Sequence, residues 1–192
     1  MPSSAVKLEV YFSGNDQGFA LLADQLYPFY EEIVPLTSSE EEGDLFSAVR
    51  AEYDPKVKLY SIIDAELIAW GATVYDSTNT ETPFSCTGKN ECYINRYLAC
   101  AKYYHADEPK GHQHLVKLAL CAAKNSTVQD DPSEVFNQCT NLIWPLDAFT
   151  QLHTCASANS AENVAIFLKE KEKTDSHPEI TSCKPVDCVS VF

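Results

Sequence analysis

The pattern of apolar and polar positions divides the chain into a mixed N-terminal part, a helical middle and a short C-terminal part. Residues 6–12 alternate between apolar and polar side chains and then end apolar, which predicts a strand, and residues 57–63 predict a second strand. Between them, apolar residues spaced by three and four predict a helix over residues 19–33. An acidic segment, residues 38–54, opens with a capping-box pattern and predicts an added helix.

The middle of the chain has a loop followed by a series of helices. Residues 70–86 are rich in glycine, serine, threonine, asparagine and proline, which predicts a loop with room for a short hairpin. Four helices are predicted next, over residues 91–104, from Asp107 to about residue 124, from Asp131 onward with Pro132 at the first helical position, and over residues 146–156.

The C-terminal part is predicted to add one more helix and a hairpin. The helix follows the cap sequence that begins at Asn159, and residues 178–192 predict the hairpin. This order of elements predicts an α/β protein with a thioredoxin-like fold and a helical insertion after the second strand. On this interpretation residues 1–85 begin the thioredoxin-like domain, residues 86–158 form the disulfide-stapled insertion, and residues 159–192 complete the domain.

Charge restricts the classes of partner. The chain of 192 residues has 14 Lys and Arg against 28 Asp and Glu, which gives a formal net charge of −14. Because phosphate binding needs clustered Lys and Arg, this balance argues against nucleic acids and anionic membrane surfaces as partners. No apolar run approaches the length of a membrane span. We expect instead a protein or cell-surface partner that carries basic patches.

Eight cysteines indicate an oxidising compartment. Their number is even, no Cys-x-x-Cys pair is present, and no spacing matches a common zinc template. The triplet Asn125-Ser126-Thr127 is an acceptor site for glycosylation at Asn125, which also favours a secreted protein. We expect about four structural disulfides, whose pairing stays open, among Cys86, Cys92, Cys100, Cys121, Cys139, Cys155, Cys183 and Cys188.

The segment from Cys86 to Cys100 contains a spaced set of residues, with Glu91 and Cys92 followed by Asn95 and Cys100. It resembles the signature C-Q-H-G-x-x-E-C-x-x-N-x-x-x-x-C of the gamma-interferon-inducible lysosomal thiol reductases, the GILT family. The Gln-His pair of that signature is absent and the first gap is one residue shorter. Gln25-Leu26-Tyr27-Pro28 also resembles the family's helix after its active site, so the likeness covers most of the chain.

The resemblance implies the family's fold but not its activity. Members carry a Cys-x-x-Cys motif between the first strand and the first helix, and counting back from residues 25–28 places those cysteines at Asn15 and Gly18. The chain has Asn15-Asp16-Gln17-Gly18 there, so both the attacking and the resolving thiol are missing. The resemblance is therefore closer to catalytically degenerate GILT-like proteins, such as the atypical mosquito one, than to the enzymes.

Two features leave alternatives open. Pro178 precedes a predicted strand, as the cis-proline opposite the active site of thioredoxin folds does, and it is equally a simple strand-start proline. Cys183 and Cys188 flank a four-residue turn, and we favour a structural disulfide there over a redox pair. A redox pair would make the protein a weak thiol–disulfide reductase or isomerase, which is the alternative function.

His105, His112 and His114 belong to no metal-binding motif and are expected to be surface histidines. We expect neither a metal nor a cofactor. The predicted function is that of a secreted, or alternatively lysosomal, GILT-like protein that is not an enzyme and acts by binding.

Overall fold

The computed structural model describes eight stretches of the chain: residues 6–12, 63–71, 73–88, 90–108, 110–125, 131–145, 147–176 and 189–191. The helices predicted over residues 19–33 and 38–54 lie outside the described residues.

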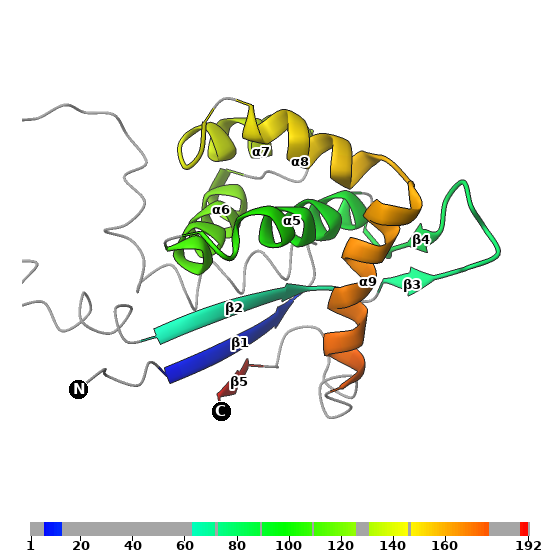
Figure 1. The fold of residues 1–192 in the computed structure, drawn as a ribbon, viewed down its shortest axis with the longest axis horizontal. Coiled ribbons are helices and arrows are strands. Elements are labelled where there is room, and N and C mark those ends of the chain that lie inside the picture. Colours follow the sequence, from blue (N-terminus) through cyan, green and yellow to red (C-terminus); the bar gives the residue numbers. More distant parts are fainter. Residues whose placement is uncertain are drawn as a thin grey trace, which may run out of the picture.

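Three strands form the main sheet of the described part (Figure 1). β1 (Val6–Phe12) pairs in parallel with β2 (Ile63–Ala69), from Val6 opposite Ile63 to Phe12 opposite Ala69. β5 (Val189–Val191) pairs with the other side of β1 and runs antiparallel to it. Because β1 and β2 are parallel, both end at the same edge of the sheet, which we call the carboxyl edge.

The second strand extends further along the chain than the apolar pattern predicted. The prediction placed it at residues 57–63, whereas the structure has β2 at residues 63–69, and residues 57–62 lie outside the described residues. From Leu67 to Trp70 every residue is 6% exposed or less. Residues 63–67 alternate between apolar and polar side chains, but residues 67–69 form a continuous apolar run, as a covered strand does, and the prediction did not assign that run to the strand.

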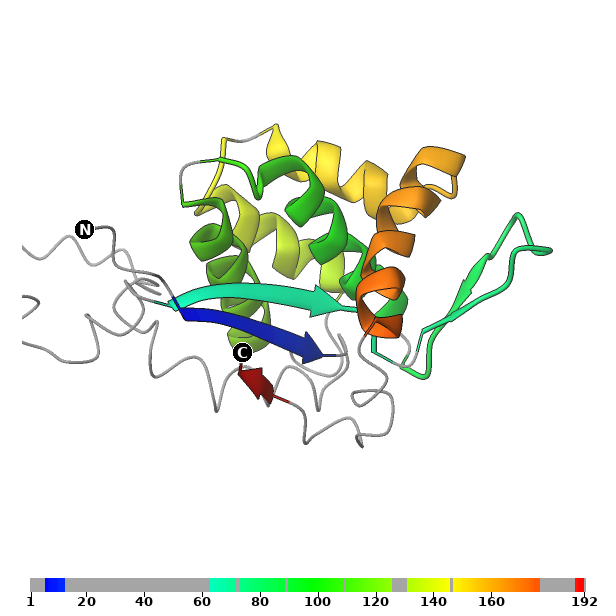
Figure 2. The same ribbon diagram turned by 60° about the horizontal axis from the view of Figure 1, so that its bottom comes forward.

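The five helices of the described residues lie on one face of this sheet (Figure 2). α5 (Glu91–His105) and α6 (Gly111–Asn125) lie nearest the strands. α7 (Pro132–Asn141) and α8 (Ala148–Ser157) pack on α6 and α5, and α9 (Ala161–Asp175) contacts β2 and α5 near the carboxyl edge.

Local signals in the sequence predicted the starts of two helices correctly. The carboxylate of Asp131 accepts a hydrogen bond of 2.9 Å from the backbone N–H of Ser133, and Pro132 occupies the first helical position of α7. At α9 the hydroxyl of Ser160 accepts a hydrogen bond of 3.2 Å from the backbone N–H of Asn163.

The start of α6 differs from its prediction because a tight turn separates it from α5. Lys110 has a φ of 65°, and the N–H of Gly111 donates to the carbonyl oxygen of Glu108 at 2.8 Å. A Cβ atom at Gly111 would lie 2.2 Å from the carbonyl oxygen of His105. Only glycine permits this close approach, so α6 begins at residue 111 instead of residue 107.

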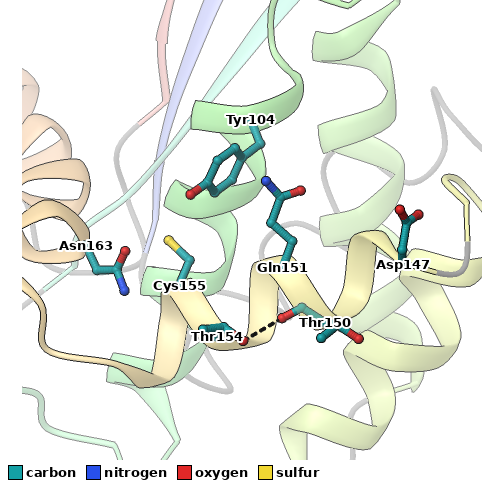
Figure 3. Close-up of a pocket in the computed structure, with 7 residues that line it drawn as sticks. All are labelled: Tyr104, Asp147, Thr150, Gln151, Thr154, Cys155 and Asn163. Carbon is teal, nitrogen blue, oxygen red and sulfur yellow. Dashed lines mark hydrogen bonds between the residues drawn. The ribbon is translucent and has the colours of Figure 1, made fainter.

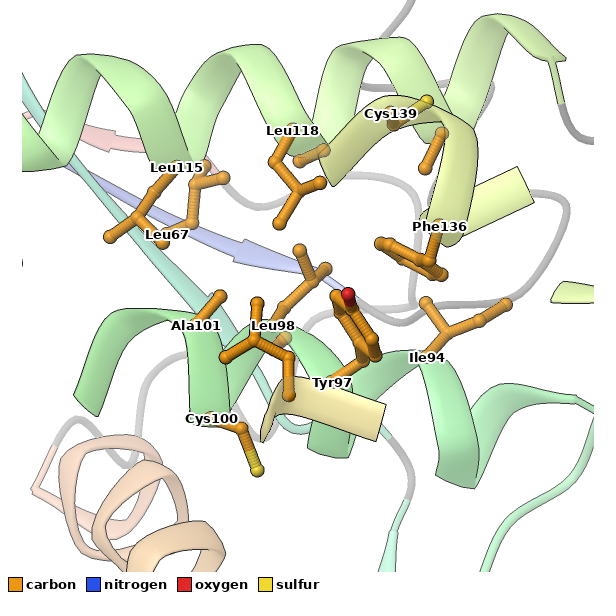
Figure 4. Packing of buried hydrophobic residues seen from close by; sticks show 14 of the residues in the cluster. Leu67, Ile94, Tyr97, Leu98, Cys100, Ala101, Leu115, Leu118, Phe136 and Cys139 are labelled. Carbon is orange, nitrogen blue, oxygen red and sulfur yellow. The ribbon is translucent and has the colours of Figure 1, made fainter. Parts of the chain in front are cut away.

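Side chains of α5, α6, α7, α8 and the two parallel strands form one buried core (Figure 4). Tyr97 of α5 is fully buried and stacks on Phe136 of α7, with ring centroids 4.3 Å apart. Its hydroxyl makes a hydrogen bond of 2.8 Å with the hydroxyl of Thr140. The paired polar group removes the cost of burying a tyrosine at the centre of the core.

Disulfides link the helical part, as predicted. Cys100–Cys155 joins α5 to α8, and Cys121–Cys139 joins α6 to α7. Cys86–Cys92 closes the loop in front of α5. Cys183 and Cys188 lie outside the described residues. Of the predicted fold, the sheet and the disulfide-linked helices are therefore confirmed, and the thioredoxin-like arrangement with an insertion stays a prediction.

A second, two-stranded sheet projects beyond the carboxyl edge (Figure 2). Its strands are β3 (Val74–Tyr75) and β4 (Phe84–Ser85), and they pair antiparallel. The Phe84 ring lies 4.8 Å from that of Phe167 on α9 and 6.2 Å from that of Trp70, measured between centroids. These aromatic contacts attach the hairpin to the rest of the protein.

Charged side chains of β2, α5 and α9 form an ion-pair network beside the core. Lys102 Nζ lies 3.0 Å from Glu66 Oε1 and 2.8 Å from Glu170 Oε1, and it donates to the carbonyl oxygen of Leu67 at 3.2 Å. Lys173 also pairs with Glu66. Glu170 is only 4% exposed, so its charge depends on Lys102 for compensation.

The network makes the protein sensitive to acid. Burial by itself would raise the pKa of Glu66, but the hydrogen bonds and charges of Lys173 and Lys102 outweigh it and lower the pKa from 4.5 to about 2. The folded protein therefore binds a proton at Glu66 more weakly than the unfolded chain does. Stability from this group is complete above about pH 4.5 and is lost as the pH falls toward 2.

We predict that Glu66→Gln flattens the acid limb of the stability curve. The difference between pKa values of 4.5 and about 2 corresponds to about 3 kcal/mol of unfolding free energy. The measurement is chemical unfolding of both proteins between pH 5 and pH 2. Glu81→Gln, which changes an exposed loop side chain, is the control and should follow the parent. Parallel curves for the parent and Glu66→Gln would contradict the prediction.

Candidate functional site

The segment singled out in the sequence, Cys86 to Cys100, comprises the loop after β4 and the first ten residues of α5. Cys86 follows β4 directly, and Cys92 is the second residue of α5. Their disulfide brings the two Cα atoms to 5.5 Å and closes a loop of five intervening residues. The loop is therefore fixed to the first turn of the helix.

Glu91 fixes the same loop with its side chain. It is 1% exposed, and its Oε2 accepts hydrogen bonds of 2.8 Å from both the N–H of Gly88 and the hydroxyl of Thr87. A buried carboxylate is stable only with such donors, so the loop and the glutamate depend on each other.

Asn95 attaches α5 to the chain that leaves β2. It is fully buried, and its Nδ2 donates to the carbonyl oxygen of Trp70 at 3.1 Å and to Thr73 Oγ1 at 3.3 Å. The Thr73 hydroxyl donates to the same Trp70 carbonyl and lies 3.3 Å from Cys86 Sγ. The amide and the disulfide therefore meet at Thr73.

The last residue of the segment, Cys100, is 1% exposed and bonded to Cys155 of α8. Glu91, Cys92, Asn95 and Cys100 thus connect α5 in turn to its loop, to the end of β2 and to α8. Reasoning from the sequence identified these four residues but missed their partners Trp70 and Thr73. Thr73 stood in a stretch predicted to be loop, and no spacing rule pointed to it.

The described residues contain no free cysteine and no cluster of side chains that could hold a metal ion. The one sulfur pair among them that is partly exposed is Cys86–Cys92.

A comparison with known protein families finds a match to the region that contains this segment. The sequence model described as gamma interferon inducible lysosomal thiol reductase (GILT) matches residues 43–143, just over half of the chain. The chain belongs to the GILT family. It is therefore related to thiol reductases, and the resemblance noted from the sequence is confirmed. No curated protein sequence matches the chain in a direct comparison.

The GILT match includes the Cys86–Cys100 segment and begins after Asn15 and Gly18, the residues at which the sequence resemblance predicts the family's Cys-x-x-Cys motif. Asn15 and Gly18 lie outside the described residues, as do Pro178, Cys183 and Cys188. Their roles stay predictions.

Asn125, the predicted glycosylation site, is the last residue of α6 and is exposed. Its Nδ2, the atom to which a glycan would be attached, donates to the carbonyl oxygen of Cys121 at 2.8 Å. A glycan replaces one of the two hydrogens on this atom, so the other can still donate to the Cys121 carbonyl.

His105 is not the surface histidine that we expected. It is 8% exposed, its ring stacks on that of Trp144 with centroids 4.5 Å apart, and its Nδ1 lies 2.8 Å from Glu108 Oε1. Trp144 Nε1 donates to the other carboxylate oxygen at 3.2 Å. The hydrogen bond with His105 lowers the pKa of Glu108, and burial lowers the pKa of His114, which contacts Trp144 edge-on. Trp144 lies far from His105 in the sequence, so no local pattern indicated this cluster.

A shallow pocket of about 500 Å³ lies between α5, α8 and α9 (Figure 3). Asp147 is its one carboxylate, and the sulfur of Cys155 in it is held in a disulfide. The lining therefore offers hydrogen-bonding groups but no nucleophile or acid–base pair.

No helix among the described residues is long and apolar enough to cross a bilayer.

We predict that Asn95→Ala destabilises the protein by about 2 kcal/mol, because it removes donors from a buried carbonyl and a buried hydroxyl. The measurement is the free energy of unfolding in guanidinium chloride. The control is Asn141→Ala at the exposed end of α7, where a change below about 0.5 kcal/mol is expected. Equal effects of the two substitutions would show that Asn95 does not hold α5 to β2.

Proposed function

We propose that this GILT-family protein has lost the family's reductase centre and acts by binding a protein or cell-surface partner. The observation that carries the proposal is the sequence Asn15-Asp16-Gln17-Gly18 at the positions of the family's Cys-x-x-Cys motif. The assignment of those positions depends on the likeness of residues 25–28 to the family's helix after the active site.

The chemistry of the family requires two thiols at that motif. The first attacks a substrate disulfide as a thiolate, and the second releases the product by attacking the mixed disulfide. Asparagine has no sulfur and glycine has no side chain, so neither step can run there.

The pairing of the other cysteines in disulfides supports the proposal. The six cysteines in the described part of the chain form Cys86–Cys92, Cys100–Cys155 and Cys121–Cys139. Four of them are 1% or 3% exposed, which suits a structural role. We propose the same role for Cys183 and Cys188.

The net charge of −14 supports a binding role with a basic partner. Several disulfides also suit secretion, or alternatively the lysosome, because both compartments lie on the secretory route. A glycan at Asn125 belongs to the same proposal, since this residue is exposed at the end of α6.

We predict that the parent protein reduces insulin no faster than dithiothreitol alone, whereas Asn15→Cys combined with Gly18→Cys gains turnover. The two new thiols would restore the attacking and resolving groups of the family mechanism. The measurement is the rate of insulin reduction. Asn15→Ser with Gly18→Ser is the matched control and should stay at the blank rate.

Turnover by the parent that disappears on replacing Cys183 or Cys188 would instead support the alternative, a weak reductase. If the two introduced cysteines form no disulfide with each other, positions 15 and 18 are not those of the family motif.

We predict that the labelled, glycosylated protein binds to its target cells in a saturable manner, and that binding weakens as salt rises. Screening by salt reduces the attraction between an acidic surface and a basic partner. Glu40→Gln, Glu41→Gln and Glu42→Gln together should weaken binding, and Lys169→Gln, which removes an exposed positive charge, should not. Binding that neither saturates nor responds to salt would contradict the proposal.

A further inference from the structure

The three disulfides of the described residues differ in their surroundings. Cys100–Cys155 and Cys121–Cys139 connect helices across the core, and their cysteines are at most 3% exposed. Cys86 and Cys92 are both only partly buried, and their bond closes a short loop. A thiol from solution can approach this bond, while the packed helices exclude it from the other two.

The position of Cys92 favours a negative charge on its sulfur. It is the second residue of α5, where the positive end of the helix dipole stabilises an anion. Arg96 follows one turn later, but its guanidinium donates to Asn159 Oδ1 and to the carbonyl oxygen of Ala158 and lies 5.5 Å from the ring centroid of Phe84. Glu91 opposes the anion, but its carboxylate accepts hydrogen bonds from the loop.

The surroundings of Cys86 favour a neutral thiol. The proton of the Thr73 hydroxyl is directed to the carbonyl oxygen of Trp70, and Asn95 donates to the hydroxyl oxygen. Thr73 Oγ1, 3.3 Å from Cys86 Sγ, can therefore only accept from that sulfur. A disulfide sulfur has no proton to donate, whereas a thiol does, so reduction would complete this hydrogen-bond network.

We propose that Cys86–Cys92 is an exchangeable disulfide, which small thiols and dithiols reduce and re-form in the native protein while the other two disulfides stay intact. This site is separate from the positions of the family's Cys-x-x-Cys motif and independent of the proposed binding role. It lies beyond the same carboxyl edge at which β1 ends.

Reduction by an external dithiol takes two steps. One thiolate of an external dithiol attacks Cys86 Sγ, the Cys86–Cys92 bond breaks, and its electron pair leaves on Cys92 Sγ. The second thiol of the reagent loses its proton and attacks the sulfur of the reagent in the mixed disulfide. Cys86 leaves with the electron pair and takes up a proton. The new S–H group then donates a hydrogen bond to Thr73 Oγ1. The reagent becomes a cyclic disulfide, and the protein holds one thiol and one thiolate; the proton lost by the second thiol of the reagent equals the one that Cys86 takes up, so none is released overall.

The first test uses the unaltered protein. It is incubated without denaturant in increasing dithiothreitol, alkylated, and mapped by peptide mass spectrometry. We expect alkylated Cys86 and Cys92 at concentrations at least tenfold below those that open Cys100–Cys155 or Cys121–Cys139. Simultaneous opening of all three bonds, or opening of a buried one first, would overturn the proposal.

The second test separates the two sulfurs. Cys86→Ser leaves Cys92 as the free thiol, and Cys92→Ser leaves Cys86. The rate of alkylation by iodoacetamide is measured against pH, and the midpoint for Cys92 should lie below that for Cys86. The opposite order would overturn the assignment of Cys92 as the leaving thiolate.

Thr73 provides the third test. Thr73→Val removes the acceptor for the Cys86 thiol and should lower the equilibrium constant for reduction by glutathione about twofold to tenfold. Thr73→Ser keeps the hydroxyl and should restore it. A merely structural role for Thr73 would change the unfolding midpoint without changing this equilibrium, and that result would overturn the role given to Thr73.

Discussion

The buried amide of Asn95 is the contact on which the arrangement of this protein depends. It holds α5 to the backbone at the end of β2, through the carbonyl oxygen of Trp70 and the hydroxyl of Thr73. With α5 fixed there, Cys92 faces its loop, Cys100 reaches α8, and Lys102 reaches the acidic residues of β2 and α9. One helix thus sets the positions of the elements around it.

Two features of the GILT family, its signature in residues 86–100 and its reactive Cys-x-x-Cys motif, do not depend on each other in this arrangement. Glu91, Asn95 and Cys100 are each used in connecting α5 to neighbouring structure. Their burial means that changing them affects stability, whether or not a reactive motif is present elsewhere in the chain. A chain can therefore keep the signature for reasons of folding alone, which is what the proposed loss of the reductase centre requires.

Features determined by neighbouring residues could be predicted from the sequence, and features determined by distant contacts could not. Asp131 and Ser160 cap their helices as expected, because a cap is made within one turn. The predicted end of β2 was wrong, since neighbouring elements cover its last residues, which form a continuous apolar run. The burial of His105 depends on Trp144, and the contact of Cys86 with Thr73 depends on the hairpin between them. Neither leaves a periodic pattern.

The pairing of β5 with β1 has a consequence for the order of folding. Leu8 lies opposite Val191, so nearly the whole chain separates the two strands. During synthesis β1 must wait for β5, whereas the contacts and disulfides of α5 to α8 close over far shorter distances in sequence. The helical part can therefore be oxidised and compact on the growing chain while one side of β1 is still unpaired. In that interval the exposed edge of β1 is where a chaperone would bind, or where a second chain could add a strand.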